Sequence, residues 1–220
     1  SALDLHGQAM ADEDAVLLAR LLQTRAQLTH LDLHDNKLGV AGVTAVAEAI
    51  ATSGTPLQSL SVASNRLGAL ACTALLRGLG RVEPPSLQSL DLSDNPITEG
   101  PSAAFDTRAL VVLAAILAAP RCALASLGLG ATQLCGRDGE GSYVADGVAI
   151  LAAALAKSTA PLASVRLSGN AMRDAEADLL AETLDARARA GRPPLAFDLS
   201  TNSLTSSKLH ALAELCTLTA

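Results

Sequence analysis

The sequence predicts an α/β solenoid built from strand–turn–helix units that repeat along the chain. Apolar residues alternate over short segments such as Leu31-Asp32-Leu33, which places them on one face of a strand. Shortly afterwards the apolar spacing becomes three and four, as in Val43, Val46 and Ile50, which is typical of one face of a helix. Because this succession recurs, each unit can bury its apolar face only against its neighbours.

The unit recurs about seven times over residues 1–220, which we interpret as a single domain. One position of the unit carries a polar residue in every copy: Gln8, Asn36, Asn65, Asn95, Thr132, Asn170 and Asn202. Successive strands joined by helices can pair only in parallel, and a helix is wider than the spacing between strands. We therefore expect a curved, right-handed βα horseshoe with parallel strands on the concave face and helices on the convex face.

The polar position explains how the turn after each strand is stabilised. An amide side chain carries both donors and an acceptor, so it can satisfy backbone groups that a strand leaves exposed as it bends into a buried turn. Leucine or alanine could not do this. Asn36, Asn65, Asn95, Asn170 and Asn202 are therefore predicted to be structural residues.

The clearest unit reads Leu28, Leu31, Leu33, Asn36, Leu38 and then Gly42, which resembles the motif LxxLxLxxNxL of the ribonuclease-inhibitor class of leucine-rich repeats. The resemblance covers essentially the whole chain, although Gln8 and Thr132 depart from the motif. It implies a horseshoe that binds protein partners on its concave face or along its loop edges. Since the chain starts within a repeat and neither end shows a polar cap, we expect a fragment of a longer protein.

Composition limits the classes of partner. Only 1% of the residues are aromatic although 50% are hydrophobic, so aliphatic side chains must fill the core. The net charge of −6 provides no broad cationic field, and we expect no binding to nucleic acid. No membrane span or signal peptide is visible, so we expect no membrane association. An intracellular location, in the cytoplasm or on the cytoskeleton, is favoured by the cysteines, which lack CxxC spacing. Cys72 and Cys216 fit core positions, whereas Cys122 and Cys135 fall in loops and could be exposed.

The residues beside the inward leucines of the strands are expected to form the concave surface. They are small and polar, and the candidates for partner contact are His30, Asp32, His34, Asp91 and Arg166. His6 and His34 occupy equivalent positions of neighbouring strands, with Asp4 nearby. Imidazoles and carboxylates at this spacing could ligate a transition metal, but a patch that titrates near neutral pH is the favoured interpretation. No metal or other cofactor is expected.

Two units are longer than the rest, with inserts near residues 98–108 and 136–146. Phe105 lies in one insert and Tyr143 in the other, which suggests that the two loops meet. The favoured interpretation is that the two rings pack together and close the loops. The functional alternative is a partner-binding knob with a polar rim consisting of Arg108, Arg137, Asp138 and Glu140.

Two further patterns only weakly resemble sites that bind phosphate or calcium. The glycines near residue 139 lack the GK[ST] ending of a phosphate loop, and the acidic residues around Asp138 lack the glycine and terminal glutamate of a calcium loop. Arg187, Arg189 and Arg192 gather at the end of a helix, where positive charge suits the helix dipole. We interpret them as a solvated helix end, with phosphate binding as the alternative.

No catalytic triad, paired carboxylate or metal signature stands out, so we expect no enzyme. The favoured function is a non-catalytic protein–protein interaction scaffold, in a cytoskeletal, flagellar or regulatory assembly. Two alternatives remain open. One is a regulator of a small GTPase, since the array resembles that of the Ran GTPase-activating protein. The other is the ligand-sensing repeat domain of an intracellular immune receptor.

Overall fold

Each unit of the chain begins with a short strand whose central residue is apolar, followed by a turn and a helix. The computed structural model describes residues 1–24, 27–83 and 85–209. Its elements are β1 (Ala2–Asp4), α1 (Asp12–Leu22), β2 (His30–Asp32), α2 (Val40–Ser53), β3 (Ser59–Ser61), α3 (Ala69–Leu79), β4 (Ser89–Asp91), the 3-10 turn η1 (Pro101–Ala103), α4 (Arg108–Ala118), β5 (Ser126–Gly128), β6 (Gly136–Arg137), β7 (Tyr143–Val144), α5 (Asp146–Lys157), β8 (Ser164–Arg166), α6 (Asp174–Arg189) and β9 (Ala196–Asp198).

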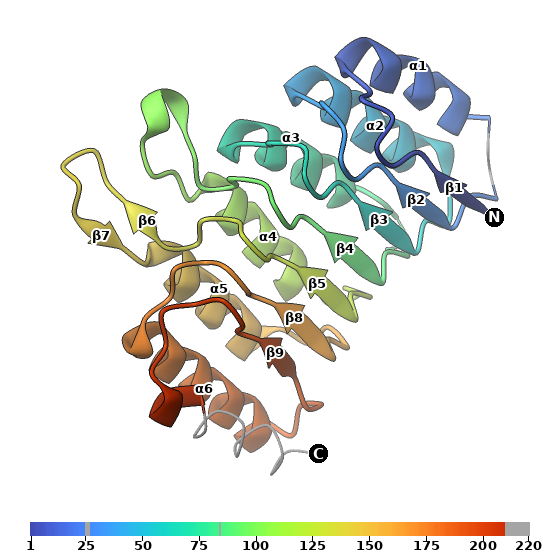
Figure 1. Ribbon diagram of the computed structural model, residues 1–220. Helices are drawn as coiled ribbons and strands as arrows, with labels where there is room; N and C mark the ends of the chain where they lie inside the picture. The colour runs from blue at the N-terminus through green and yellow to red at the C-terminus, as the bar shows by residue number, and fades with distance from the viewer. Residues whose placement is uncertain (25–26, 84, 210–220) are drawn as a thin grey trace.

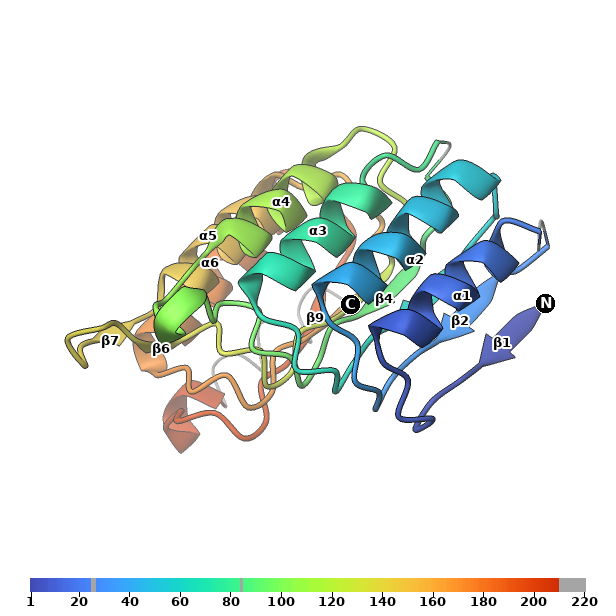
Figure 2. The same cartoon turned by 90° about the horizontal axis from the view of Figure 1, so that it is seen from above.

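Seven of these strands form one parallel sheet in the order β1-β2-β3-β4-β5-β8-β9. The helices form one layer over one face of this sheet and leave the other face open (Figures 1 and 2). The register aligns the central apolar residue of every strand with that of the next. The predicted α/β solenoid with parallel strands is thereby confirmed. None of the described helices combines the length and apolarity that crossing a membrane requires.

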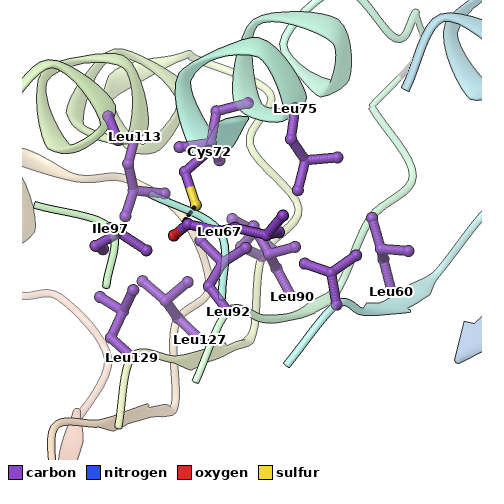
Figure 3. Close-up of a cluster of buried hydrophobic side chains, with 14 of the residues drawn as sticks. Leu60, Leu67, Cys72, Leu75, Leu90, Leu92, Ile97, Leu113, Leu127 and Leu129 are labelled. Carbon is purple, nitrogen blue, oxygen red and sulfur yellow. Dashed lines mark hydrogen bonds between the residues drawn. The ribbon is translucent and has the colours of Figure 1, made fainter. Parts of the chain in front are cut away.

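The core lies between the sheet and the helix layer. Leu60, Leu90 and Leu127 point from three neighbouring strands toward helix residues such as Cys72 and Leu113 (Figure 3). These five side chains are at most 1% exposed. Close packing of one aliphatic layer on the next explains why the fold needs so few aromatic residues.

The asparagine side chains stabilise the turn that repeats in each unit. The Asn65 amide donates hydrogen bonds to the carbonyls of Leu33 (2.9 Å), Val62 (3.0 Å) and Ala63 (3.0 Å), and its Oδ1 accepts the N–H of Leu38 (3.1 Å). Each amide thus joins its own strand end to the preceding unit, and we call this series of contacts the amide ladder. Equivalent bonds are made by Asn36, Asn95, Asn170 and Asn202.

The two departures from the motif alter the ladder. Gln8 is exposed and donates to the carbonyl of His6 within its own turn. Thr132 is fully buried, and its hydroxyl donates to the carbonyl of Leu129 at 2.8 Å. A threonine is too short to reach the preceding strand, so the Ile97 N–H donates instead to the carbonyl of Asn95 in its own turn.

The residue before most of these polar positions adopts a left-handed backbone conformation. Asp35, Ser64, Asp94 and Ala131 have φ values between 51° and 57°. Such angles are costly for residues with a Cβ atom, and the equivalent Gly7 and Gly169 avoid this cost. The tight turn is therefore enforced by the ladder rather than by local preference.

Candidate functional site

The histidines near the N-terminus form a stacked pair on the open face of the sheet. The rings of His6 and His34 are parallel to within 3°, with centroids 4.8 Å apart. Nδ1 of His6 lies 2.7 Å from Oδ1 of Asp4, and Nδ1 of His34 lies 3.0 Å from Oδ1 of Asp32. His30, which the sequence grouped with them, instead contacts the Thr29 hydroxyl at 2.8 Å.

Charge couples the members of this cluster. The hydrogen bond with Asp4 raises the pKa of His6, and the hydrogen bond with His6 lowers the pKa of Asp4. Part of the face therefore gains positive charge as the pH falls toward the acid side of neutrality. Within the described residues, no group of three or more His, Cys, Asp or Glu side chains is placed to hold a metal ion.

Farther along the same face, an ion pair spans an intervening strand. Arg166 on β8 reaches over β5 to Asp91 on β4, with 3.4 Å between Nη1 and Oδ2. Gly128 makes this possible, because a Cβ atom there would lie 2.1 Å from the Asp91 carboxylate. The sequence predicted Asp91 and Arg166 as separate contact residues, whereas the structure pairs them above a polar trough lined by Ser89, Ser126 and Ser164.

The first insert, at residues 98–108, is held by polar contacts within the loop and with the next unit. The carboxylate of Asp106 pairs with Nε of Arg108 at 2.7 Å. The Thr98 hydroxyl donates to the carbonyl of Gln133 at 2.6 Å, which ties this insert to the turn before the second one. Arg108 is therefore engaged within its own loop, although its side chain remains 52% exposed.

The second insert, at residues 136–146, is an antiparallel hairpin formed by β6 and β7. Asp138 organises its tip, since its Oδ1 accepts the N–H groups of Glu140 (3.0 Å) and Ser142 (2.8 Å). Arg137 donates to the carbonyl of Gly141 at 2.6 Å. The tip thus has one hydrogen-bonded shape while Arg137 and Glu140 remain exposed. Figure 1 shows both inserts projecting beyond the repeats at the same edge of the molecule.

The two insert rings have different neighbours from those predicted. Phe105 packs over β6, where a Cβ atom on Gly136 would lie 3.4 Å from the ring. Tyr143 instead stacks under the guanidinium of Arg173, 3.7 Å from the ring centroid. Among the described residues, the stacked aromatic pair is His6–His34, so the prediction that Phe105 and Tyr143 pack together is wrong. The inserts meet through Phe105 and Gly136 rather than through two rings.

The Tyr143 hydroxyl fixes the hairpin to the following unit. It donates to Oε2 of Glu176 at 2.8 Å, and the same carboxylate oxygen accepts the N–H of Arg173. Burial, followed by hydrogen bonds with Cys135 and Glu176, raises the pKa of the Tyr143 phenol. Glu176 stands where two other units have the small residues Gly42 and Ala71, and it is buried.

The cysteines are mostly core residues. Cys72 is buried, and burial raises its pKa to about 12. Cys135 is 3% exposed, so the expectation that it could be exposed is wrong, and burial raises its pKa to about 11. Cys122 is half-buried, and Cys216 lies outside the described residues. High thiol pKa values make Cys72 and Cys135 poor nucleophiles.

Sequence reasoning missed an apolar cavity of about 310 Å³ between α3 and α4. Val82, Leu87, Val112, Ile116 and Cys122 are among its lining residues. Val112 and Ile116 lie on α4, and the other three residues lie in the loops that lead to β4 and β5. No pattern in the sequence distinguishes a cavity wall from a filled core.

Comparison with known proteins also identifies repeats in this chain. Residues 27–47 and 86–107 match two family models, each described as a leucine-rich repeat. The human protein "NACHT, LRR and PYD domains-containing protein 12" is 30% identical over 195 residues, which cover 89% of this chain and 16% of that protein. The chain thus spans about a sixth of the length of this curated relative. With one strand, one turn and one helix per unit, the chain belongs to the leucine-rich repeat proteins.

Proposed function

We propose that this chain is a non-catalytic module that binds a protein partner along the edge formed by its two inserts, residues 98–108 and 136–146, which we call the insert ridge. The observation that carries this proposal is the ordering of the hairpin tip. Asp138 holds two backbone N–H groups of the tip, and Tyr143 ties the hairpin to the next unit. A loop that is already ordered loses little conformational entropy on binding.

The composition of the ridge fits a polar rim around a small apolar patch. Arg108, Arg137 and Glu140 are exposed, while Pro101 and Ala104 offer exposed apolar surface. By contrast, the open face of the sheet carries small side chains and the arginine Arg166, whereas the ridge carries Arg108 and Arg137. Binding anchors are usually arginines and aromatic residues, so the ridge is the better candidate. The cellular role would be that of a scaffold in a cytoskeletal, flagellar or regulatory assembly.

The test is affinity capture from the native cell with three variants whose folding is first checked by circular dichroism. Arg137→Ala/Glu140→Ala removes the charges of the tip, and Asp91→Ala/Arg166→Ala removes the ion pair of the open face. Arg20→Ala/Glu48→Ala, on exposed positions of α1 and α2, is the matched control. Partners lost only with the tip variant support the ridge. Partners lost only with the open-face variant would contradict it.

A second candidate is the ligand-sensing repeat domain of an intracellular immune receptor. The identity to the human relative favours it, since the name of that protein includes NACHT and PYD domains beside its repeats. Free cysteines at positions 72, 122 and 135 suit the reducing interior of a cell. This role requires further domains in the same protein. Sequencing the complete transcript decides between the candidates, because a scaffold needs no nucleotide-binding domain.

A further inference from the structure

The arginines at the end of α6 do not form the solvated helix end that the sequence predicted. Arg189 is exposed, but Arg187 is only 2% exposed and Arg192 is half-buried. The repeat position that Arg187 occupies is filled by serine in two other units, at Ser53 and Ser158. The repeat itself therefore does not require a cation at this place.

Backbone carbonyl groups accept hydrogen bonds from only some of the N–H donors of the two guanidinium groups. Arg187 donates from Nη1 to the carbonyl of Leu155 (3.0 Å) and from Nη2 to that of Pro193 (3.2 Å). Arg192 donates from Nη1 to the carbonyl of Ser158. Nε of each arginine is buried and has no acceptor within the described residues. Buried N–H donors without an acceptor are rare and costly in folded proteins.

Arg187 and Arg192 also lack a carboxylate partner in the described part of the chain. The arginines that form ion pairs there are Arg108 and Arg166. Burial, with a smaller contribution from the charge of Arg192, lowers the pKa of Arg187. A buried cation without a compensating anion is destabilising, and two neighbouring cations repel each other. The site is therefore electrostatically incomplete.

A pocket adjoins both guanidinium groups. It has a volume of about 260 Å³ and is lined by Leu184, Arg187, Ala188, Arg192 and the loop residues Pro193 to Leu195. This is more room than one water molecule needs, so a small polyatomic ligand can enter.

We propose that this pocket binds a phosphate-type oxyanion between Arg187 and Arg192. Planar guanidinium groups recognise such oxyanions through paired, charge-assisted hydrogen bonds, and a phosphate beside them would supply the missing negative charge. The ligand meets the guanidinium edges at the pocket wall.

The test measures thermal unfolding of the chain with increasing inorganic phosphate at constant ionic strength, with sodium chloride as the replaced salt. We expect a saturable rise of about 3 °C at roughly ten times the Kd. Arg192→Met should abolish this rise, whereas Arg189→Met, a neighbouring exposed arginine on the same helix, should keep it. A rise of equal size in all three proteins would reflect a general salt effect and would overturn the proposal, as would the absence of any saturable rise.

Isothermal titration at 25 °C extends the test to the source of the oxyanion. O-phosphoserine and inorganic phosphate are titrated separately into the wild type and into Arg192→Met. Tighter binding of phosphoserine assigns the pocket to a phosphorylated segment, and equal or weaker binding assigns it to free phosphate. Because Arg192 is only half-buried, its variant is expected to fold, and loss of heat with both ligands in a folded variant supports the site. No heat with either ligand in the wild type would refute it.

Discussion

Replacing Asn95 with alanine measures the energy that the amide ladder contributes to folding. Asn95 is 0% exposed. Its Oδ1 accepts the N–H groups of Asn65 (3.0 Å) and Leu67 (2.9 Å), and its amide donates to the carbonyls of Val62 (2.9 Å) and Leu92 (3.0 Å). The Val62 carbonyl retains a second donor from Asn65. Two N–H groups and the Leu92 carbonyl therefore lose a partner.

Each buried polar group that loses its partner costs about 1–3 kcal/mol. Water entering the space left by the amide would satisfy one of the three, so we expect Asn95→Ala to lower the free energy of unfolding by about 4 kcal/mol. Urea unfolding followed by far-ultraviolet circular dichroism gives this value if the slope with denaturant is unchanged.

Asn202→Ala is the matched control for that measurement. Asn202 accepts the N–H groups of Asn170 and Met172, but it is half-buried and open to water. We expect its replacement to cost about 1 kcal/mol, because water replaces the lost bonds. An Asn95→Ala cost below about 1 kcal/mol, or one equal to that of Asn202→Ala, would refute the view that burial makes the ladder important.

Three further predictions concern the anchor, the turn and the histidine pair. Tyr143→Phe should lower the free energy of unfolding by about 1.5 kcal/mol, since the buried Glu176 carboxylate loses a charge-assisted bond, and an unchanged urea midpoint would contradict this role. Ala131→Gly should raise the free energy of unfolding by about 0.5–1 kcal/mol, because Ala131 has a φ of 51° that glycine adopts without strain. The thermal midpoint should therefore rise, and a lower midpoint would show that the turn tolerates alanine. The raised pKa of His6 implies a stabilising contribution that is fully present below about pH 6.5 and is lost as the pH rises through the folded pKa. In an NMR titration, Asp4→Asn should return the His6 pKa toward its usual value, and no change would exclude the hydrogen bond as the cause.

The repeat architecture was predictable because it is written in local spacing. Leu31 and Leu33 alternate, Val46 and Ile50 follow at helical spacing, and the next unit repeats both. Parallel pairing then follows from connectivity, since a strand that enters a helix must return in the same direction. The place where the repeat is extended was equally visible, because an insert changes the distance between equivalent residues.

The contacts of the extended loops were not predictable from spacing. Tyr143 contacts Arg173 and Glu176, which lie in the next unit. No periodicity in the sequence links these two residues to the hairpin. The same limit applies to Arg187, whose position near a helix end suggested solvent, whereas the adjacent loop and the preceding helix enclose it. Burial of a single polar side chain depends on neighbours from three segments, and composition alone does not identify them.

The amide ladder is interrupted at the unit in which the first insert begins. Thr132 cannot reach the preceding unit, so the turn after Asn95 closes on itself through Ile97. The Thr98 hydroxyl then makes the link that an asparagine would have made, through the carbonyl of Gln133. A threonine at position 132 therefore releases the loop after β4 from the regular path, while a side chain of that loop restores the connection between units. The first insert leaves the regular path where the ladder lacks one rung, whereas the second insert follows a turn whose bonds to Asn170 are intact. Thr132→Asn should therefore pull the first insert back toward the regular turn.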